Sequence, residues 1–467
     1  MPSREGPMFK LKDILDATGG KEVSSGPVRF GNISTDSRTI GPGELFVPLT
    51  GPNFDGHGFI DAVFKKGAAG TLVKKGTRLK YPEGKTVIEV GDTLRALQET
   101  AHFIRMKRTG IPVIGVTGTN GKTTTKEMLA SILSVRGPVL KNDGNLNNEI
   151  GVPLTLLRLE KRHLAAVIEM GMSALGEIAR LAEIAAPSIG IITNIGPGHL
   201  GSLGSMDAVA RAKGELVLAL PEDGKAILNG DDPYLKNIIE ENRHRTLTFG
   251  ITGKADIAAA DIKESDSGIS FKLIFPGGTE EIALPVIGLH NVYNALAASA
   301  AALAAGADAA NIKEGLGAWQ PVKMRMEITE IDGARIINDA YNANPASMAA
   351  ALNALASIKG SRKMAVLGDM LELGKAASKS HFDVGRMAGA QDLTLLILTG
   401  GHAPLTAQGA MEAGMPEERI FIVESPTAAA AILAERLKPG DHVLIKGSRS
   451  MKMERVVDLL RGRSLVA

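Results

Sequence analysis

The sequence contains no cysteine among its 467 residues. This excludes disulfide bonds, thiolate metal sites and a cysteine nucleophile, and it is compatible with a reducing compartment. No stretch approaches the roughly 18 uninterrupted apolar residues of a membrane-spanning helix. Residues 1–10 also lack the apolar core of a signal peptide. We therefore expect a cytoplasmic protein with no stable membrane insertion.

Aromatic residues and an excess of one charge are also scarce. Phe, Trp and Tyr make up 4% of the chain, and the formal net charge is only +2. Such a charge gives no broad attraction to nucleic acid, so we expect no nucleic-acid partner and instead small anionic ligands bound at local sites. Hydrophobic residues reach 44% and charged residues 22%, as in soluble globular proteins. The length predicts roughly three domains.

The main chemical signal lies in residues 111–126. An apolar run at residues 111–116 leads into a loop of glycine, threonine and asparagine, and residues 127–133 are predicted to form a helix. A strand, a glycine loop and a helix N-terminus in this order bind phosphate, because loop N–H groups and the helix dipole attract an anion. We predict nucleotide binding, with a cation from Lys122 and the Thr123 hydroxyl on Mg²⁺. The predicted ATP-binding loop residues are Gly118, Thr119, Asn120, Gly121, Lys122, Thr123 and Thr124.

The loop departs from the strict P-loop pattern, which places a glycine five positions before the glycine of Gly-Lys-Thr. Val116 occupies that position, so Gly118 and Gly121 must supply the flexible backbone. The alternative is an ordinary glycine turn with a solvated lysine. The order of strand, loop and helix favours nucleotide binding over that alternative.

Alternating apolar runs and helical patterns predict an α/β fold of three domains. We place a small α/β domain at residues 1–106, a central P-loop-type ATPase domain with a mostly parallel sheet at 107–321, and a C-terminal Rossmann-like domain at 322–467. Within the central domain, an antiparallel insert is predicted at about residues 256–283. A short helix at residues 11–18 should end at Gly19 and Gly20.

Polar residues follow the apolar runs of the central domain. Because parallel strands end at one edge of a sheet, Thr117, Glu169 and His199 can converge on one site. A lone histidine is more often structural, but its neighbours favour His199 as a metal ligand. Mg²⁺ prefers oxygen, so Mn²⁺ is also possible there. Residues 196–201 match G-x-G-x-x-G, but Pro197 offers no N–H to a phosphate and no helix is predicted to start directly at this loop, so we reject a dinucleotide site.

Other polar segments have both a functional and a structural interpretation. Residues 34–38 combine hydroxyls, a carboxylate and a guanidinium, which suits a sugar or phosphate but is equally ordinary turn chemistry. Asn291 and Asn294 lie one helical turn apart and could bind adenine or simply cap that helix. Residues 142–148 form an amide-rich loop.

Several motifs together resemble the Mur ligases, which build the peptide of bacterial peptidoglycan. They are the phosphate loop at residues 115–124, Glu169, His199, Ala-Lys-Gly-Glu at 212–215 and His-Asn-Val-Tyr-Asn at 290–294, and the resemblance covers essentially the whole chain in order. Val116 in the phosphate loop is a trait of that family.

Within the family, residues 339–348, 368–374 and 446–450 resemble the branch that adds D-alanyl-D-alanine. The branch that adds the third residue typically has Tyr-Ala-His where this chain has Tyr-Asn-Ala-Asn at 341–344. It also uses an Asn-Pro-Arg signature, which does not occur at the corresponding place.

The resemblance implies an ATP-dependent amide ligase that joins D-alanyl-D-alanine to UDP-N-acetylmuramoyl-tripeptide through an acyl phosphate. We expect a monomer. It implies Mg²⁺ on Thr123 and Glu169, a second metal at His199, and carbamylation of Lys213, whose alternative is an ordinary surface lysine. The C-terminal domain is expected to swing onto the central one when nucleotide binds. Alternatives are the third-residue ligase, folylpolyglutamate synthetase, a P-loop kinase and a regulatory NTPase.

The resemblance also implies roles for individual residues. Those implied to be catalytic are Lys122, Glu169, His199 and Lys213. Those implied to bind ATP outside the loop are Asn291, Asn294, Arg325 and Asp339. Those assigned to substrate binding are Ser34, Asp36, Ser37, Arg38 and Phe46 for uridine diphosphate, and Asn145, Asn148, Tyr341, Asn342, Asn344, Ser347, Lys446 and Ser448 elsewhere.

Overall fold

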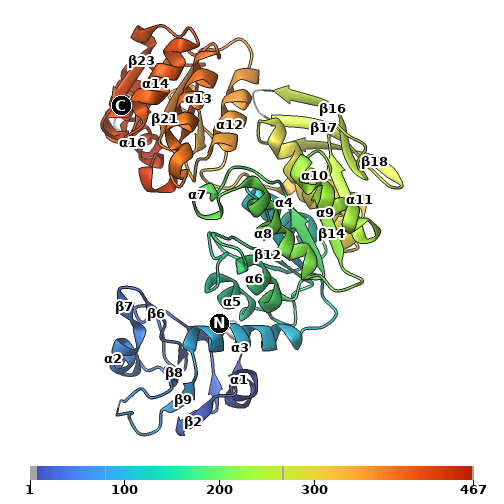
Figure 1. Cartoon of the computed structure of the whole chain (residues 1–467), viewed down its shortest axis with the longest axis vertical. Coiled ribbons are helices and arrows are strands. Elements are labelled where there is room, and N and C mark those ends of the chain that lie inside the picture. Colours follow the sequence, from blue (N-terminus) through green and yellow to red (C-terminus); the bar gives the residue numbers. More distant parts are fainter. Residues whose placement is uncertain (1–7, 79, 266–267, 465–467) are drawn as a thin grey trace.

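A computed structural model describes residues 8–78, 80–265 and 268–464 and arranges them as three α/β units (Figure 1). The N-terminal and C-terminal units lie at opposite ends, with the central unit between them. The predicted three-part α/β architecture is confirmed. Residues 1–7, most of the segment in which we expected no signal peptide, lie outside the described residues. None of the described helices combines the length and the apolar character needed to cross a membrane.

The N-terminal unit is built on a five-stranded sheet in which β2 runs antiparallel to β9 and the other neighbours are parallel. In sheet order its strands are β2 (Lys21–Ser24), β9 (Thr86–Val90), β8 (Gly70–Lys74), β5 (Leu45–Phe46) and β4 (Ile33–Ser34). Two smaller pairs join β1 (Phe9–Lys10) to β3 (Arg29–Phe30) and β6 (Thr50–Gly51) to β7 (Phe54–Asp55). The helices are α1 (Leu11–Thr18), α2 (Ile60–Lys65) and α3 (Thr93–Met106). As predicted, α1 ends at Gly19, which takes a left-handed φ of +61° and donates its N–H to Leu15.

Helix α3 connects the N-terminal unit to the central one, and Figure 1 shows it lying between them. Its buried face, including Leu97 and Ala101, belongs to a core shared by both units. Gln98 donates to the Glu149 carbonyl (3.1 Å) and accepts from Arg180 (2.9 Å). The predicted first unit therefore contacts the central unit through this helix as well as through the chain itself.

The central unit contains a nine-stranded sheet that is parallel from β11 to β16 and antiparallel from β16 to β18. In sheet order its strands are β11 (Val139–Lys141), β12 (Ala165–Glu169), β10 (Val113–Thr117), β13 (Ile189–Ile192), β14 (Lys225–Asn229), β15 (Thr246–Gly250), β16 (Ile257–Ser265), β17 (Gly268–Phe275) and β18 (Gly278–Leu284). The antiparallel insert is thus confirmed. The helices are α4 (Lys122–Ser134), α5 (Gly151–Leu156), α6 (Glu177–Ala185), α7 (Leu200–Leu203), α8 (Met206–Leu218), α9 (Lys236–Glu241), α10 (Leu289–Ala304) and α11 (Ala309–Ala318).

Burial explains the central strands. Every residue of β10, β12 and β13 is buried, so continuous apolar runs occur there instead of alternation. The alanine-rich α10 packs closely on α4 and the sheet because its small side chains allow a close approach.

Two sequence predictions about this unit were wrong in detail. Helix α4 begins at Lys122 and not near residue 127, because the left-handed Gly121 (φ +81°) turns the chain directly into the helix. A four-residue helix, α7, also starts within residues 196–201, where none was predicted, and it is preceded by His199 in a left-handed conformation (φ +58°).

The C-terminal unit has a six-stranded sheet that is parallel except at the pair β19 and β20. In sheet order its strands are β19 (Glu327–Ile331), β20 (Ala334–Asp339), β24 (His442–Lys446), β21 (Lys363–Gly368), β22 (Leu395–Thr399) and β23 (Ile420–Val423). Its helices are α12 (Pro345–Ser357), α13 (Ala377–Gly389), α14 (Ala403–Glu412), α15 (Pro426–Arg436) and α16 (Glu454–Ser464). Asp339 and Lys446 end adjacent parallel strands in register, so both face the same sheet edge.

Candidate functional site

The loop after β10 requires glycine at two positions. Gly118 has a φ of +145°, and a Cβ there would lie 1.9 Å from the Thr193 hydroxyl. Gly121 has a φ of +81°, and a Cβ there would lie 2.2 Å from the Asn294 side-chain oxygen. Any other residue would strain the backbone and displace these neighbours. The two glycines chosen from the sequence are therefore essential to the loop conformation.

The same loop is held by residues that follow β13. The Asn120 N–H donates to Asn194 Oδ1 (2.9 Å), and the Asn120 carbonyl accepts from Asn194 Nδ2 (3.0 Å) and from Thr193 Oγ1 (2.6 Å). The Thr119 N–H donates to the Asn194 carbonyl (2.9 Å). Sequence reasoning missed Thr193 and Asn194, although their polar side chains at the end of an apolar run were a usable signal. These bonds make the loop rigid before any ligand binds.

Lys122 begins α4 and folds back over the loop. Its Nζ donates to the carbonyls of Gly118 (2.8 Å) and Thr119 (3.1 Å). Burial lowers the pKa of Lys122, and the nearby Glu169 carboxylate opposes that shift. An anionic phosphate in the loop would provide the strong partner that this ammonium lacks.

Glu169, at the end of β12, faces the first turn of α4. Its Oε2 accepts from the Thr123 hydroxyl (2.8 Å), and its Oε1 accepts from Asn147 Nδ2 (2.8 Å). Carboxylate and hydroxyl oxygens are the ligands that Mg²⁺ prefers, so this pair fits a magnesium ion bound to a nucleotide. Asn147 was missed as an individual residue, although it lies in the amide-rich loop noted from the sequence.

His199 and Lys213 line the same cavity as Glu169. Lys213 lies on α8 and is only 3% exposed, so it is not a surface lysine. Burial lowers its pKa well below the usual value, and the charge on Lys122 adds to this effect. Burial also lowers the pKa of His199, while Glu372, whose Oε2 lies 3.5 Å from His199 Nδ1, opposes the shift. Both groups thus favour their neutral forms.

Thr117, the third residue expected to converge with Glu169 and His199, is fully buried and does not line this cavity.

A cavity of about 800 Å³ lies between the central and C-terminal units. The predicted residues that line it are Thr119, Asn120, Gly121, Lys122, Thr123, Thr124, Asn145, Asn148, Glu169, His199, Lys213, Asn291, Asn294, Arg325, Asp339, Tyr341, Asn342, Asn344, Ser347 and Lys446. Lining residues to which the sequence analysis gave no individual role include Asn147, Ser173, Glu177, Asn194, His290, Tyr293 and Glu372. His290, Tyr293 and Glu372 lie within motifs quoted from the sequence at 290–294 and 368–374, whereas Glu177 lies outside any of those motifs.

The C-terminal unit contributes a charged and polar wall. Lys446 Nζ contacts Asp339 Oδ2 at 2.5 Å and donates to the Asn342 carbonyl (3.0 Å). The Arg325 guanidinium stacks 4.0 Å from the Tyr341 ring. Because Lys446 is 2% exposed and paired, it positions Asp339 as well as bordering the cavity.

A direct contact links this wall to the phosphate loop. The Asn344 amide donates to Asn120 Oδ1 (2.7 Å), and the Asn120 amide lies 3.4 Å from Asn344 Oδ1. Asn344 also caps α12 by accepting from the Ser347 N–H (2.9 Å). One side chain therefore joins the helix start to the nucleotide loop.

On α10, Asn291 and Asn294 are buried and bonded to one another (3.1 Å). Asn291 donates to the Ile287 carbonyl (2.9 Å), and Asn294 accepts from Thr125 (3.3 Å). The residue that caps α10 is Gly288, so the capping interpretation was wrong.

Seven of the predicted site residues do not line the cavity: Ser34, Asp36, Ser37, Arg38, Phe46, Gly118 and Ser448. Phe46, assigned to the uridine-diphosphate-binding region, is 1% exposed, and its side chain packs in the N-terminal core. Ser448 is 3% exposed and accepts from the Leu371 N–H (2.8 Å), which makes it a support of the neighbouring loop. Gly118 has no side chain, and its carbonyl accepts a hydrogen bond from Lys122 Nζ.

Residues 34–38 lie in the N-terminal unit, away from this cavity. Asp36 and Arg38 form a two-pronged ion pair (2.9 and 2.8 Å) at an exposed surface, and Arg38 is 86% exposed. The Arg38 guanidinium and N–H lower the pKa of Asp36 to about 2. Asp36 thus bonds both Ser34 and Arg38 within this turn, and the exposed guanidinium, although paired with Asp36, faces solvent, where an anion could approach it.

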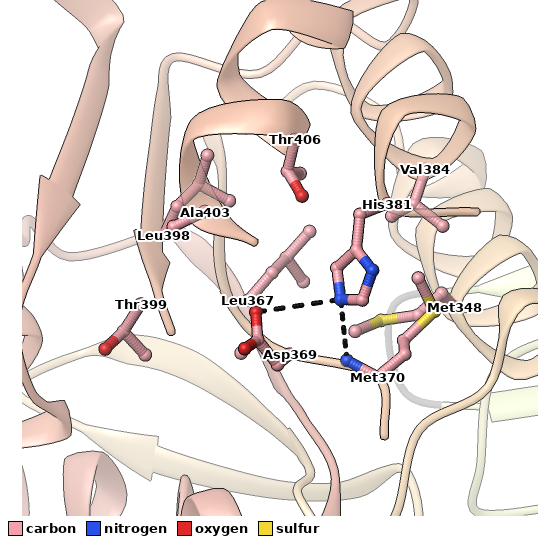
Figure 2. Close-up of a pocket in the computed structure, with 11 residues that line it drawn as sticks. Met348, Leu367, Asp369, Met370, His381, Val384, Leu398, Thr399, Ala403 and Thr406 are labelled. Atoms are coloured by element: carbon pink, nitrogen blue, oxygen red, sulfur yellow. Dashed lines mark hydrogen bonds and ion pairs between the residues drawn. The ribbon is translucent and has the colours of Figure 1, made fainter. Parts of the chain in front are cut away.

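A second cluster with metal-ligand residue types lies inside the C-terminal unit. Ligand atoms of Asp369, His381 and His402 lie within 4.8 Å of one another. Figure 2 shows His381 pointing toward Asp369 and the Met370 N–H. His381 Nε2 accepts from Met370 (2.9 Å) and its Nδ1 bonds the Ala377 carbonyl (2.8 Å), so both nitrogens are already used. The cavity beside them holds only about 10 Å³. We interpret this cluster as support for the loop after β21.

Comparison with family models matches three parts of the chain. Residues 29–116 match the model described as Mur ligase family, catalytic domain. Residues 116–302 match the Mur ligase middle domain, and residues 324–449 match the Mur ligase, glutamate ligase domain.

Individual proteins give the same result. The chain is 39% identical over 427 residues to the UDP-N-acetylmuramoyl-tripeptide--D-alanyl-D-alanine ligase of Bacillus subtilis (strain 168). The aligned residues make up 91% of this chain and 92% of that protein. The crystal structure of MurF from Acinetobacter baumannii is 33% identical, with a TM-score of 0.90 over 98% of this chain and 99% of that one. MurF ligase from Thermotoga maritima in complex with ADP is 28% identical, with a TM-score of 0.82 over 93% and 98%. This chain belongs to the Mur ligase family.

Proposed function

We propose that this chain is an ATP-dependent ligase that joins D-alanyl-D-alanine to UDP-N-acetylmuramoyl-tripeptide in peptidoglycan precursor synthesis. One observation carries the proposal. A single cavity is bordered by a phosphate loop and a strand-end carboxylate on one side, and by Arg325, Asp339 and Lys446 on the other. The names of the relatives at 33–39% identity support the choice of substrates.

The first step transfers the γ-phosphoryl group of ATP to the terminal carboxylate of the muramoyl tripeptide. The bond between γ-phosphorus and the β,γ-bridging oxygen breaks, an acyl phosphate forms and ADP leaves. The N–H groups of the rigid loop and the Lys122 ammonium stabilise charge on the transferring group. Asn291 and Asn294 are proposed to lie beside the nucleotide base, with Arg325 and Asp339 closing over it.

Thr123 and Glu169 would hold Mg²⁺, and a second ion, Mg²⁺ or Mn²⁺, would lie near His199. A bound ion supplies neutralising charge for the phosphates. The neutral amine of Lys213 can attack CO₂, which forms an N–C bond and releases one proton. The resulting carbamate replaces a potential cation with an anionic oxygen ligand beside His199.

In the second step, the neutral amine of D-alanyl-D-alanine attacks the acyl carbon. A tetrahedral intermediate forms and collapses to the amide with loss of inorganic phosphate. Asn145 and Asn148, which line the cavity, are proposed to contact the muramoyl peptide. Tyr341, Asn342, Asn344, Ser347 and Lys446 border the side of the cavity where the dipeptide would enter.

We assign uridine diphosphate binding to residues 1–106, with Ser34, Asp36, Ser37 and Arg38 at its anionic groups. Residues 107–321 would bind ATP, and residues 322–467 would bring the amine. We also propose that the enzyme acts as a monomer. Since ATP and a UDP-linked precursor are the substrates, we propose that the enzyme works in the cytoplasm.

Purified chain with Mg²⁺, ATP, UDP-muramoyl-tripeptide and D-alanyl-D-alanine tests the proposal. Phosphate release should require both cosubstrates, and mass spectrometry should detect the pentapeptide product. An amine panel separates this activity from that of a third-residue ligase or a folylpolyglutamate synthetase. Tripeptides ending in meso-diaminopimelate or lysine then define the acceptor. Phosphate release with neither cosubstrate would instead indicate an NTPase.

A further inference from the structure

A buried lysine lies behind the wall of the cavity. Lys126 is on α4, one turn after Thr123, and is 1% exposed. Its Nζ donates to the Asn142 carbonyl (2.7 Å) and lies 3.1 Å from Glu127 Oε1 and 3.8 Å from Glu169 Oε2. Removing an ammonium from water is strongly unfavourable unless its partners compensate. The position of this charge therefore requires an explanation, and phosphate binding does not supply one.

Asn142 is the second member of this arrangement. Strand β11 ends at Lys141, and the Asn142 side chain then bonds the backbone of Glu169 as a further strand residue would. Its Oδ1 accepts from the Glu169 N–H (2.8 Å), and its Nδ2 donates to the Glu169 carbonyl (2.9 Å) and to the Leu146 carbonyl (2.8 Å). These bonds hold the end of β12 and the start of the amide-rich loop in one position.

Lys126 connects three segments that carry groups around Glu169. Helix α4 provides Thr123, the amide-rich loop provides Asn147, and β12 provides Glu169 itself. The ammonium contacts the loop through the Asn142 carbonyl and the carboxylate through Oε2. Losing this cation would leave the three segments without the charge that holds them together.

Two lysines attract the Glu169 carboxylate, and the balance between them determines where the carboxylate lies. Lys122 lies on the cavity side and attracts the same carboxylate. Lys126 attracts it from a buried position that does not line the cavity. With Lys126 present, Oε2 remains at the Thr123 hydroxyl and Lys122 stays free to meet phosphate. Without it, the carboxylate would be drawn toward Lys122 and would occupy part of the phosphate site.

We propose that Lys126, acting through Asn142, is a positioning residue that holds Glu169 in place for the magnesium nucleotide. The inference rests on the proposed function, because it assumes that Glu169 bears on the metal. It assigns to Lys126 a role in catalysis without contact with any substrate.

The test is the Mg²⁺ dependence of ADP binding, measured by calorimetry with the full chain. Lys126→Met keeps the length and apolar stem of the side chain and removes the charge. We expect the Mg²⁺ concentration that half-saturates the enhancement of ADP binding to rise about 10-fold or more, the usual effect of losing a partner behind a metal ligand. ADP binding without Mg²⁺ should change less than about 2-fold. In turnover, kcat should fall by a similar factor.

Glu127→Gln is the matched control, because it removes another partner of Lys126 and leaves Glu169 untouched. Its Mg²⁺ dependence should match that of the unaltered chain, even if its melting temperature falls. Lys126→Arg should recover part of the loss. If Lys126→Met does not fold, Lys126→Gln, which can still donate to Asn142, is judged by the same criterion.

An unchanged Mg²⁺ dependence in a folded Lys126→Met or Lys126→Gln chain would overturn the proposal and leave Lys126 a purely structural residue. Failure of the proposed function gives a different result. In that case the unaltered chain itself would bind ADP without any effect of Mg²⁺, or would form no pentapeptide.

Discussion

At the scale of single residues, the site depends on charges that are held close to the protein backbone. Lys122 donates to two carbonyls of its own loop, a weak substitute for a phosphate. These two bonds hold the Lys122 side chain in one rotamer, so the ammonium is in position before the ligand binds. The charge is therefore ready before ATP binds.

Lys122→Ala should lower kcat by about 10²–10³-fold, the usual effect of removing one group that stabilises transition-state charge. ATP affinity should fall as well, because phosphate loses its cationic partner. Phosphate release that depends on both cosubstrates is the measurement. Lys225→Ala, at an exposed position, is the control and should retain full activity. Equal activity in both variants would remove Lys122 from the mechanism.

Carbamylation of Lys213 gives a second prediction at this scale. Because burial lowers the pKa of Lys213, its amine is neutral at a lower pH than an exposed lysine would be. The modification should therefore form near neutral pH, fall as the pH is lowered, and contribute about 10-fold or more to kcat. Carbon NMR with labelled bicarbonate should show one carbamate signal, absent from Lys213→Ala. A carbamate signal that persists in Lys213→Ala would contradict the assignment.

At the scale of secondary structure elements, helix caps hold the two sides of the cavity together. Helices α11 and α12 both begin with a capping box, at Asp308 and Asn344 respectively. Only the second cap also contacts the phosphate loop, through Asn120. Comparing variants of the two caps therefore distinguishes a loss of helix stability from a loss of the contact with the phosphate loop.

Asn344→Ala should reduce stability by about 1 kcal/mol, the ordinary value of a lost cap. It should also raise the KM for ATP several-fold, because the contact with Asn120 is lost. Asp308→Ala should produce the same loss of stability with unchanged kinetics. Thermal denaturation and steady-state kinetics on both variants check this. Parallel kinetic losses would show that the contact with Asn120 has no role.

Asp231 links the segment after β14 to α10 and gives a pH prediction. Burial alone would raise the pKa of Asp231, but bonds from the Thr252 and Ile251 N–H groups and the Tyr293 hydroxyl lower it to about 2. The pKa of this carboxyl is lower in the folded chain than its ordinary 3.8, so the ionised group stabilises the fold above pH 3.8. That stabilisation is lost as the pH falls toward 2.

Asp231→Asn should lower stability by about 1 kcal/mol at pH 7, a figure reduced for partial exposure to solvent. The difference from the unaltered chain should shrink between pH 4 and about 2. Denaturation midpoints across that range are the measurement, with the exposed Asp223→Asn as the control. A difference that stays constant with pH would refute the electrostatic explanation.

At the scale of the whole molecule, the site requires two units to meet. The cavity lies between them, and α7 contacts the segment Gly374–Ala376 of the C-terminal unit. An acyl phosphate open to water would hydrolyse, so the units must exclude solvent during the reaction. We expect the C-terminal unit to close further when ligands bind.

Small-angle scattering should show a decrease of about 1 Å or more in the radius of gyration when an ATP analogue and UDP-muramoyl-tripeptide are added, as domain closure over a ligand predicts. Lys122→Ala with the same ligands should compact less, because the nucleotide is bound more weakly. Identical scattering with and without ligands would rule out closure as part of the mechanism.

Much of this architecture was predictable from local sequence. The predicted bounds of α1 agree with the structure, because glycine readily takes the left-handed conformation that ends the helix at Gly19. Short strands such as β2 and β11 escaped prediction. They carry few apolar residues, and their extended form depends on pairing with β9 and β12.

The sequence by itself determined the phosphate loop, the α/β order of the three units and the motifs shared with the Mur ligases, because these depend on neighbours along the chain. Only the tertiary structure decided which distant groups meet. It buried Phe46 and Ser448, placed Glu372 beside His199, and set Lys126 behind Glu169. Such contacts depend on how strands and units pack, and spacing along the chain does not encode that packing locally.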